Sequence, residues 1–374
     1  MLPAPYHSVF VTTLDPYPDK PRITFRQDGT FKLMVFADVH YGENPWDIWG
    51  PQQDTNTTRL MKTMLAIEQP DYSFSVLNIS TDSIDRVING DLITGENTFR
   101  QNSTTLIDII VQSLNDVKVP FSSTHGNHDN QVNITHMEEI VRETSLAPLS
   151  YTRRSPPDVG GVGGPGNYWV PVYEKEMDVT PVLVLWFFDS RGGVNTDGTL
   201  IPDWVDESVA RWIVKETEAM DTAWGQPESR SALAFVHIPP HAIQALQKSL
   251  NSTANPGLNA DALGQGSTQA TRDPGSEGND HTFWDTLNSH VKNLRVVISG
   301  HDHGDEWCAR EPTYDVIFCF SKHSGYGGYG EEDWGRGVRS LIFRSSVPSD
   351  GIETYILLED GTMRARVILN SEYK

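Results

Sequence analysis

Cysteine is scarce in this chain of 374 residues, which contains only Cys308 and Cys319. The two lie close together in sequence, so a short-range disulfide is favoured over two buried free thiols. Long apolar runs are also lacking, and no stretch approaches the roughly 20 residues that a membrane-spanning helix needs. The sequence therefore predicts no membrane partner.

Basic residues are few. The chain has 29 Lys and Arg against 50 Asp and Glu, a formal net charge of −21. Such a surface repels nucleic acid polymers and anionic membranes. Small phosphorylated substrates stay possible, because a bound metal can reverse the local field. Nothing in the sequence sets the oligomeric state.

The first residues, MLPAPYHSVF, lack the basic and then apolar layout of a signal peptide. The protein is therefore either cytosolic or begins after signal cleavage. Acceptor motifs for N-glycosylation favour the second alternative, a secreted or vacuolar protein. These motifs begin at Asn56, Asn78, Asn102, Asn133 and Asn251.

Apolar strand patterns alternate with helical patterns along most of the chain, which predicts an α/β sandwich around a largely parallel sheet. Strands are expected at 31–38, 86–93, near 121, 181–190, 231–238 and from 294. Helices are expected at 54–69, 100–117 and 203–220, the last with Asp203 as its N-cap.

The remaining segments differ in character. Residues 1–30 hold five prolines and predict an extended segment, whereas residues 31–374 predict a single domain. After about residue 310 only strand patterns remain, joined by turns such as Asp360-Gly361. Residues 238–280 form a long polar insert, which is either a functional lid or partly disordered.

Five short polar motifs follow directly on predicted strands. In chain order they are Asp38-Val39-His40, Gly90-Asp91, Gly126-Asn127-His128-Asp129, His237 and Gly300-His301-Asp302-His303. In open α/β sheets, sites form beyond the carboxyl ends of the strands, so five such loops can converge. Each motif alone is weak evidence, since a lone histidine is usually a core residue and Gly-Asn-His-Asp suits an ordinary turn. The ordered set indicates one functional site.

These motifs offer carboxylate, imidazole and amide donors, which together suit Mn, Fe or Zn. A thiolate site is excluded, because both cysteines lie apart from the motifs. Two ions about 3.5–4 Å apart can each bind a phosphate oxygen and share a hydroxide nucleophile. Such a pair needs a carboxylate that reaches both ions, and Asp91 after Gly90 is suited to this.

Together the motifs resemble the calcineurin-like metallophosphoesterase superfamily, whose pattern is D-x-H, G-D, G-N-H-[DE], H and G-H-x-H, over roughly residues 31–345. The resemblance implies a four-layer αββα sandwich of two mixed sheets, with the metal site at the carboxyl ends of the strands. It implies one ion held by Asp38, His40, Asp91 and His303, and another held by Asp91, Asn127, His237 and His301.

The same resemblance implies roles for two residues that do not bind metal. His128 would stabilise the phosphoryl transition state or protonate the leaving oxygen, and Asp129 would orient His128. Four further segments are similar to those of a fungal and plant branch of this superfamily, which is related to the purple acid phosphatases. These segments are Asp54–Thr58, Phe188–Ser190, His237–Pro239 and Ser324–Gly330.

One position departs from the purple enzymes, which carry a tyrosine ligand three residues after the bridging aspartate. Here that position is Thr94, so no colour from an iron-tyrosinate bond is expected. Contacts to substrate are predicted for His323, Tyr326 and Asp189. The favoured activity is a phosphomonoesterase acting on a small substrate. A phosphodiesterase or nucleotide hydrolase on the same site is the alternative, and a non-catalytic scaffold is a third hypothesis.

Overall fold

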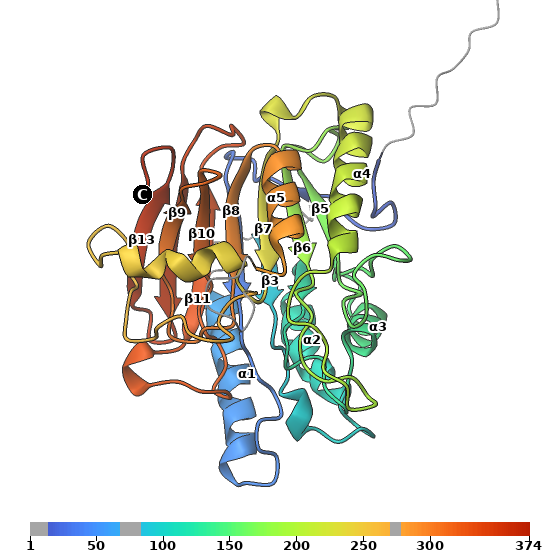
Figure 1. Cartoon of the computed structure of the whole chain (residues 1–374), viewed down its shortest axis with the longest axis vertical. Helices are drawn as coiled ribbons and strands as arrows, with labels where there is room; N and C mark the ends of the chain where they lie inside the picture. The colour runs from blue at the N-terminus through green and yellow to red at the C-terminus, as the bar shows by residue number, and fades with distance from the viewer. Residues whose placement is uncertain (1–13, 68–83, 270–277) are drawn as a thin grey trace, which may run out of the picture.

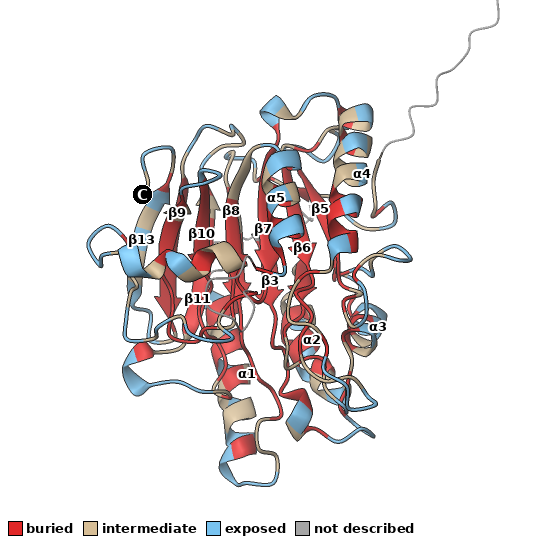
Figure 2. Ribbon diagram, viewed as in Figure 1, coloured by how far each residue is buried: buried red, intermediate tan, exposed pale blue. Residues whose placement is uncertain are grey.

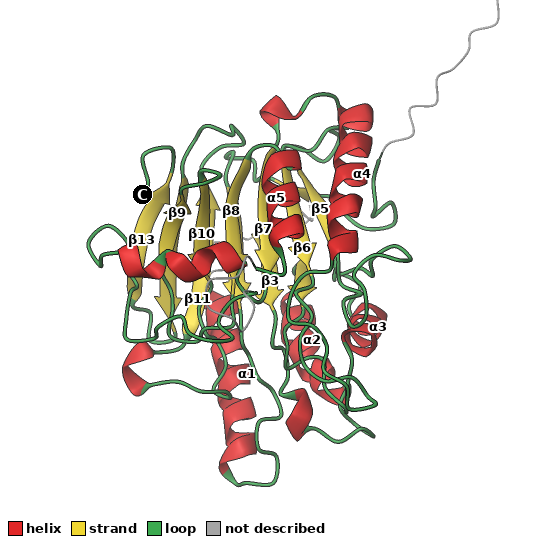
Figure 3. Ribbon diagram, viewed as in Figure 1, coloured by secondary structure: helices red, strands yellow, loops and turns green. Residues whose placement is uncertain are grey.

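Two β-sheets lie face to face, and helices cover both outer faces (Figure 1, Figure 3). This computed structural model describes residues 14–67, 84–269 and 278–374. The arrangement is the four-layer sandwich of two mixed sheets that the family resemblance implies, and that prediction is confirmed. A single, largely parallel central sheet, as the strand pattern alone suggested, is wrong, because the strands divide between two sheets.

Seven strands form the first sheet, which is parallel except at the β5–β6 and β9–β10 pairs. Its spatial order is β1 (Ile23–Thr24), β5 (Tyr168–Tyr173), β6 (Leu183–Phe188), β7 (Ser231–Val236), β8 (Leu294–Ser299), β10 (Val316–Phe320) and β9 (Cys308–Glu311). The structure joins Cys308 and Cys319 in a disulfide, directly opposite each other on β9 and β10.

Six strands form the second sheet. Its spatial order is β13 (Met363–Leu369), β12 (Ile352–Leu358), β11 (Gly337–Phe343), β2 (Phe31–Phe36), β3 (Ile84–Asn89) and β4 (Phe121–Thr124). Strands β2, β3 and β4 run parallel, whereas β11, β12 and β13 pair antiparallel. The all-strand segment after residue 310 therefore completes both sheets.

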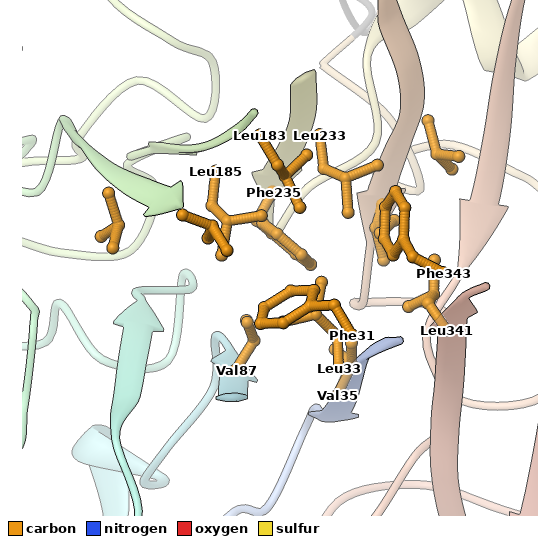
Figure 4. Close-up of a cluster of buried hydrophobic side chains, with 14 of the residues drawn as sticks. Phe31, Leu33, Val35, Val87, Leu183, Leu185, Leu233, Phe235, Leu341 and Phe343 are labelled. Carbon is orange, nitrogen blue, oxygen red and sulfur yellow. The ribbon is translucent and has the colours of Figure 1, made fainter. Parts of the chain in front are cut away.

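The core lies between the two sheets, where alternate side chains of each strand point inward. Phe31, Leu33 and Val35 of β2 face Leu185 and Phe235 of the opposite sheet (Figure 4). All five are fully buried, and most strands of both sheets are buried along their length, except the edge strand β13 (Figure 2).

Helices bury the outer faces. The six-stranded sheet is covered by α1 (Trp49–Ile67) and α2 (Thr105–Val117), with α3 (His136–Leu146) packed beside α2. The seven-stranded sheet is covered by α4 (Glu207–Trp224) and α5 (His281–His290). Short 3-10 helices are η1 (Gly95–Asn97), η2 (Pro227–Ser229), η3 (His241–Ala245), η4 (Gln247–Ser249) and η5 (Glu332–Trp334).

Some elements differ from the sequence predictions. Helix α4 begins after Asp206, whose side chain accepts the N–H of Ser208, so the predicted N-cap at Asp203 is wrong. Helix α3, helix α5 and strand β5 were not predicted. Pro171 hides β5 in the sequence, because proline is confined to sheet edges. It is tolerated here because β1 pairs only with Val172 and Tyr173.

The glycosylation motifs fall in different settings. Asn102 and Asn251 are exposed in turns, whereas the Asn133 amide donates to the Thr98 carbonyl. Asn56 lies on α1, and Asn78 lies outside the described residues. No helix in the described parts of the chain is both long and apolar enough to cross a membrane.

Candidate metal centre

The five polar motifs follow the carboxyl ends of strands from both sheets. Strands β2, β3 and β4 of the six-stranded sheet lead to the first three motifs, and β7 and β8 of the other sheet lead to the last two. Hydrogen bonds join the sheets here: His237 Nδ1 donates to the Asn89 carbonyl, Asn89 Nδ2 donates to the Ile298 carbonyl, and the His301 N–H donates to Asp38. The centre therefore lies where the two sheets meet.

Two groups of side chains point their ligand atoms at common positions. Asp38, His40 and His303 form one group, and Asp91, His237 and His301 form the other; within each, one atom per residue lies within 4.8 Å of the others. Asp91 Oδ2 is 3.0 Å from His237 Nε2 and 3.6 Å from His40 Nε2, so this carboxylate reaches both groups. These groups contain six of the seven ligands expected from the sequence.

The seventh expected ligand, Asn127, supports the fit to metal. Its Oδ1 is buried and has no hydrogen-bond partner within the described part of the chain. Leaving a buried polar atom unpaired costs about 1–3 kcal/mol, which a bound cation would remove. The oxygen and imidazole donors suit Mn, Fe or Zn, so the residues fit two such ions.

The backbone is strained at four of the expected ligands. Asp38, His40, Asp91 and His301 have φ values of 54°, 47°, 48° and 78°. Residues other than glycine adopt this region rarely, and such strain of about 1–3 kcal/mol per residue clusters at functional sites. Here the conformation turns each side chain sharply from its strand end into the centre.

At two positions of the motifs only glycine fits, because a side chain would overlap neighbouring atoms. A Cβ on Gly90, which has a φ of 82°, would overlap the His237 imidazole. A Cβ on Gly126 would overlap both Asp91 Oδ1 and the same imidazole. The glycine before Asp91 therefore makes room for a ligand from the other sheet, which the sequence could not indicate.

Outer partners fix the imidazole rings of the ligands. His40 Nδ1 donates to Thr94 Oγ1 at 3.0 Å, and His303 Nδ1 donates to the Tyr329 carbonyl at 2.6 Å. His301 Nε2 donates to the carbonyl of Gly266, in the long insert, at 2.9 Å. Such partners select the tautomer and orient a metal ligand. Thr94, which stands where the purple enzymes carry their tyrosine ligand, thus orients the ligand His40 instead of binding metal itself.

His128 is held by a residue that the sequence did not indicate. Its Nδ1 is 2.6 Å from Glu96 Oε1, on η1. Asp129 was expected to orient His128, and this is wrong: its two oxygens accept the N–H groups of Ile93 and Gly126. Asp129 thus fixes the loop backbone. Burial lowers the pKa of His128, but Asp91 and Glu96 outweigh it and raise the pKa to about 9.

The three predicted substrate contacts are all engaged with other side chains of the protein. Asp189 is fully buried and pairs with His136. His323 is 1% exposed, and its ring packs against that of the ligand His303 at a tilt, with centroids 3.9 Å apart. The Tyr326 hydroxyl contacts Glu359 and Arg59 on the outer surface. No open face is left for substrate on Asp189 or His323, and those predictions are wrong.

Comparison with known proteins agrees with this geometry. Residues 31–305 match the model of the calcineurin-like phosphoesterase family. The chain belongs to this family. Two ligand groups of the dimetal type accord with that membership.

The relatives of this chain are consistent with the fungal and plant branch of the family, which is related to the purple acid phosphatases. The chain is 26% identical to probable inactive purple acid phosphatase 28 of Arabidopsis thaliana, over 85% of this chain and 76% of that protein. It is 25% identical to phosphatase DCR2 of Saccharomyces cerevisiae, over 89% of this chain and 54% of that protein. A dimetal phosphatase of Danio rerio shares the fold, with a TM-score of 0.52 at 13% identity, over 92% of this chain and all of that one.

Proposed function

We propose that this member of the family is a metal-dependent phosphomonoesterase. The observation that carries the proposal is the retained ligand set: two groups of Asp and His side chains, and Asn127, whose Oδ1 is buried and unpaired among the described residues. A scaffold that had lost activity would be expected to lack a ligand or His128, and this chain retains both.

Two bound ions would supply Lewis acidity towards the phosphate and lower the pKa of a water molecule. The protein's own residues position the reaction. Asp91 Oδ1 accepts the backbone N–H of His128 at 2.9 Å, which ties His128 to the centre. Glu96 accepts from His128 Nδ1, so Nε2 is left to donate its proton to an oxygen of the phosphoryl group or of the leaving alcohol.

Two rival functions use the same fold. A phosphodiesterase or nucleotide hydrolase could use the same centre. A non-catalytic scaffold is favoured by one observation, the word "inactive" in the names of the two plant relatives. The intact ligand set argues against the scaffold, and the acidic surface argues against long nucleic acids.

The test is hydrolysis of p-nitrophenyl phosphate and bis(p-nitrophenyl) phosphate by chelator-stripped protein, before and after adding Mn, Zn or Fe. We expect metal-dependent turnover, faster on the monoester, that falls by about 10²- to 10⁴-fold in His128→Ala. His290→Ala, at the exposed end of α5, is the matched control. Faster turnover of the diester would favour the diesterase, and no turnover with two ions bound would favour the scaffold.

A further inference from the structure

A pocket of about 560 Å³ opens directly beside the metal centre. Two expected metal ligands, Asn127 and His301, line it. The rest of the lining comes from the segment 193–204 after β6, from Ile238 next to the ligand His237, and from Gly266 and Asn279 of the long insert. Because two expected ligands line the pocket, it adjoins the metal centre.

The wall formed by residues 193–204 is fixed to the ligand loop. The Val194 N–H donates to the Asn130 carbonyl at 2.9 Å, and the Ile201 N–H donates to the Gly193 carbonyl at 3.0 Å. Val194 and Leu200 form an antiparallel bridge, so the segment is a small hairpin. Its apolar side chains are thus held at a set distance from Asn127.

Apolar side chains make up most of the pocket lining, and no Lys or Arg lies among the described residues that form it. Val194, Leu200, Ile201 and Ile238 supply aliphatic surface, and Leu200 is 73% exposed. Among the described residues that line the pocket, Asp203 is the only one that is charged at neutral pH.

The arginine nearest in sequence, Arg191, does not line the pocket. Its side chain is 4% exposed, and its guanidinium lies 3.2 Å from Asp206 and packs over the Trp204 ring. Among the described residues, a second phosphate group entering the pocket would therefore meet Asp203 and aliphatic surface instead of a basic partner, which is unfavourable for an anion.

We propose that this pocket receives the organic part of the substrate, and that the substrate is a phosphate ester of a largely apolar alcohol without a further anionic group, rather than a polyphosphate. The inference rests on the proposed function for the phosphate position. Ligand pockets are typically apolar with a few polar groups at one end, and here the metal ligands provide that polar end.

The test measures binding separately from turnover. Calorimetry of the metal-loaded full chain would compare benzylphosphonate with methylphosphonate, which carry the same phosphonate charge and cannot be hydrolysed. We expect benzylphosphonate to bind at least about tenfold more tightly, the discrimination usual for an apolar pocket. Leu200→Asp and the uncharged Leu200→Asn should both reduce that ratio towards one.

Val179→Asp is the matched control. Val179 is 64% exposed and lies in the loop before β6, at the opposite end of that strand from the pocket segment 193–204. Its ratio should equal that of the native chain. Equal affinity for the two phosphonates, or tighter binding of inorganic triphosphate than of benzylphosphonate, would overturn the inference. The binding ratio is read whether or not esters are hydrolysed, so loss of turnover alone would overturn only the proposed function.

Discussion

Glu96 Oε1 lies 2.6 Å from Nδ1 of His128, although 32 residues separate the two in the chain. The contact fixes which imidazole nitrogen faces the metal centre. Because Glu96 orients the His128 ring, the neighbouring Asp129 is not needed for that role and does not contact the ring. Asp129 holds the loop backbone, and Glu96 holds the ring.

Glu96→Gln should lower kcat by about 10- to 100-fold, the usual effect of removing a partner that orients a catalytic or ligand imidazole. KM and the metal content per chain should stay unchanged, because Glu96 belongs to neither ligand group. Steady-state kinetics with elemental analysis checks this. Glu96→Asp should restore part of the rate. A loss of bound metal that matched the loss of rate would contradict a positioning role.

Asp91→Asn should release both metal ions, because Asp91 Oδ2 approaches ligands of both groups, His237 and His40. His301→Ala should release mainly the ion of its own group and leave about one ion per chain. Metal content after dialysis against metal-free buffer measures both. Equal losses in the two variants would show that Asp91 is not shared between the ions.

Asp189 and His136 form a fully buried pair, with Oδ2 and Nδ1 2.9 Å apart. Burial lowers the pKa of His136, but Asp189 outweighs it and raises that pKa. Burial raises the pKa of Asp189, but His136 outweighs it and lowers that pKa. The pair therefore stabilises the fold fully between the two unfolded pKa values, about pH 4 and 6.5. Its contribution fades as pH rises through the folded pKa of His136 or falls through that of Asp189.

Asp189→Asn should lower the free energy of unfolding by about 3–5 kcal/mol within that window, the usual cost of breaking a buried pair. Urea unfolding from pH 3 to pH 9, at constant metal loading, gives the difference between native and variant chains. If the variant does not fold, the free energy of unfolding of the native chain, measured over the same pH range, should still fall above and below that window. A difference that is constant across the range would contradict the assignment.

Removing the disulfide by Cys308→Ala with Cys319→Ala should lower the free energy of unfolding by about 3 kcal/mol. This follows from the loss of loop closure over a sequence separation of 11 residues. Urea unfolding of the native and double-variant chains measures it. Activity should persist, because neither cysteine belongs to a ligand group. An identical unfolding free energy with and without reductant would argue against the bond.

Expression through a secretory pathway should place glycans on Asn102 and Asn251, which are exposed, and leave Asn133 free because its amide already donates to Thr98. Gel mobility before and after endoglycosidase, for single Asn→Gln variants, checks each position. No shift at either exposed asparagine would contradict the proposal that the protein is secreted or vacuolar.

The sequence by itself determined the side chains of the centre. Apolar runs such as residues 31–36 predict strands, because alternate side chains must bury on two faces, and the polar motifs follow where those strands end. The family pattern then indicated seven candidate metal ligands, and the structure brings six of them into two groups. The net charge of −21 and the presence of only two cysteines were likewise read from the sequence alone.

Only the tertiary structure decided the contacts between those motifs. Local patterns do not show that Asp38 and His237 belong to different sheets, since strand pairing depends on packing of distant segments. They do not show that Asp189 turns inward to His136 while Glu96 reaches His128, since each pair joins separate loops. A strand pattern fixes burial within one element, whereas the partner of a polar side chain is fixed by whichever element folds against it.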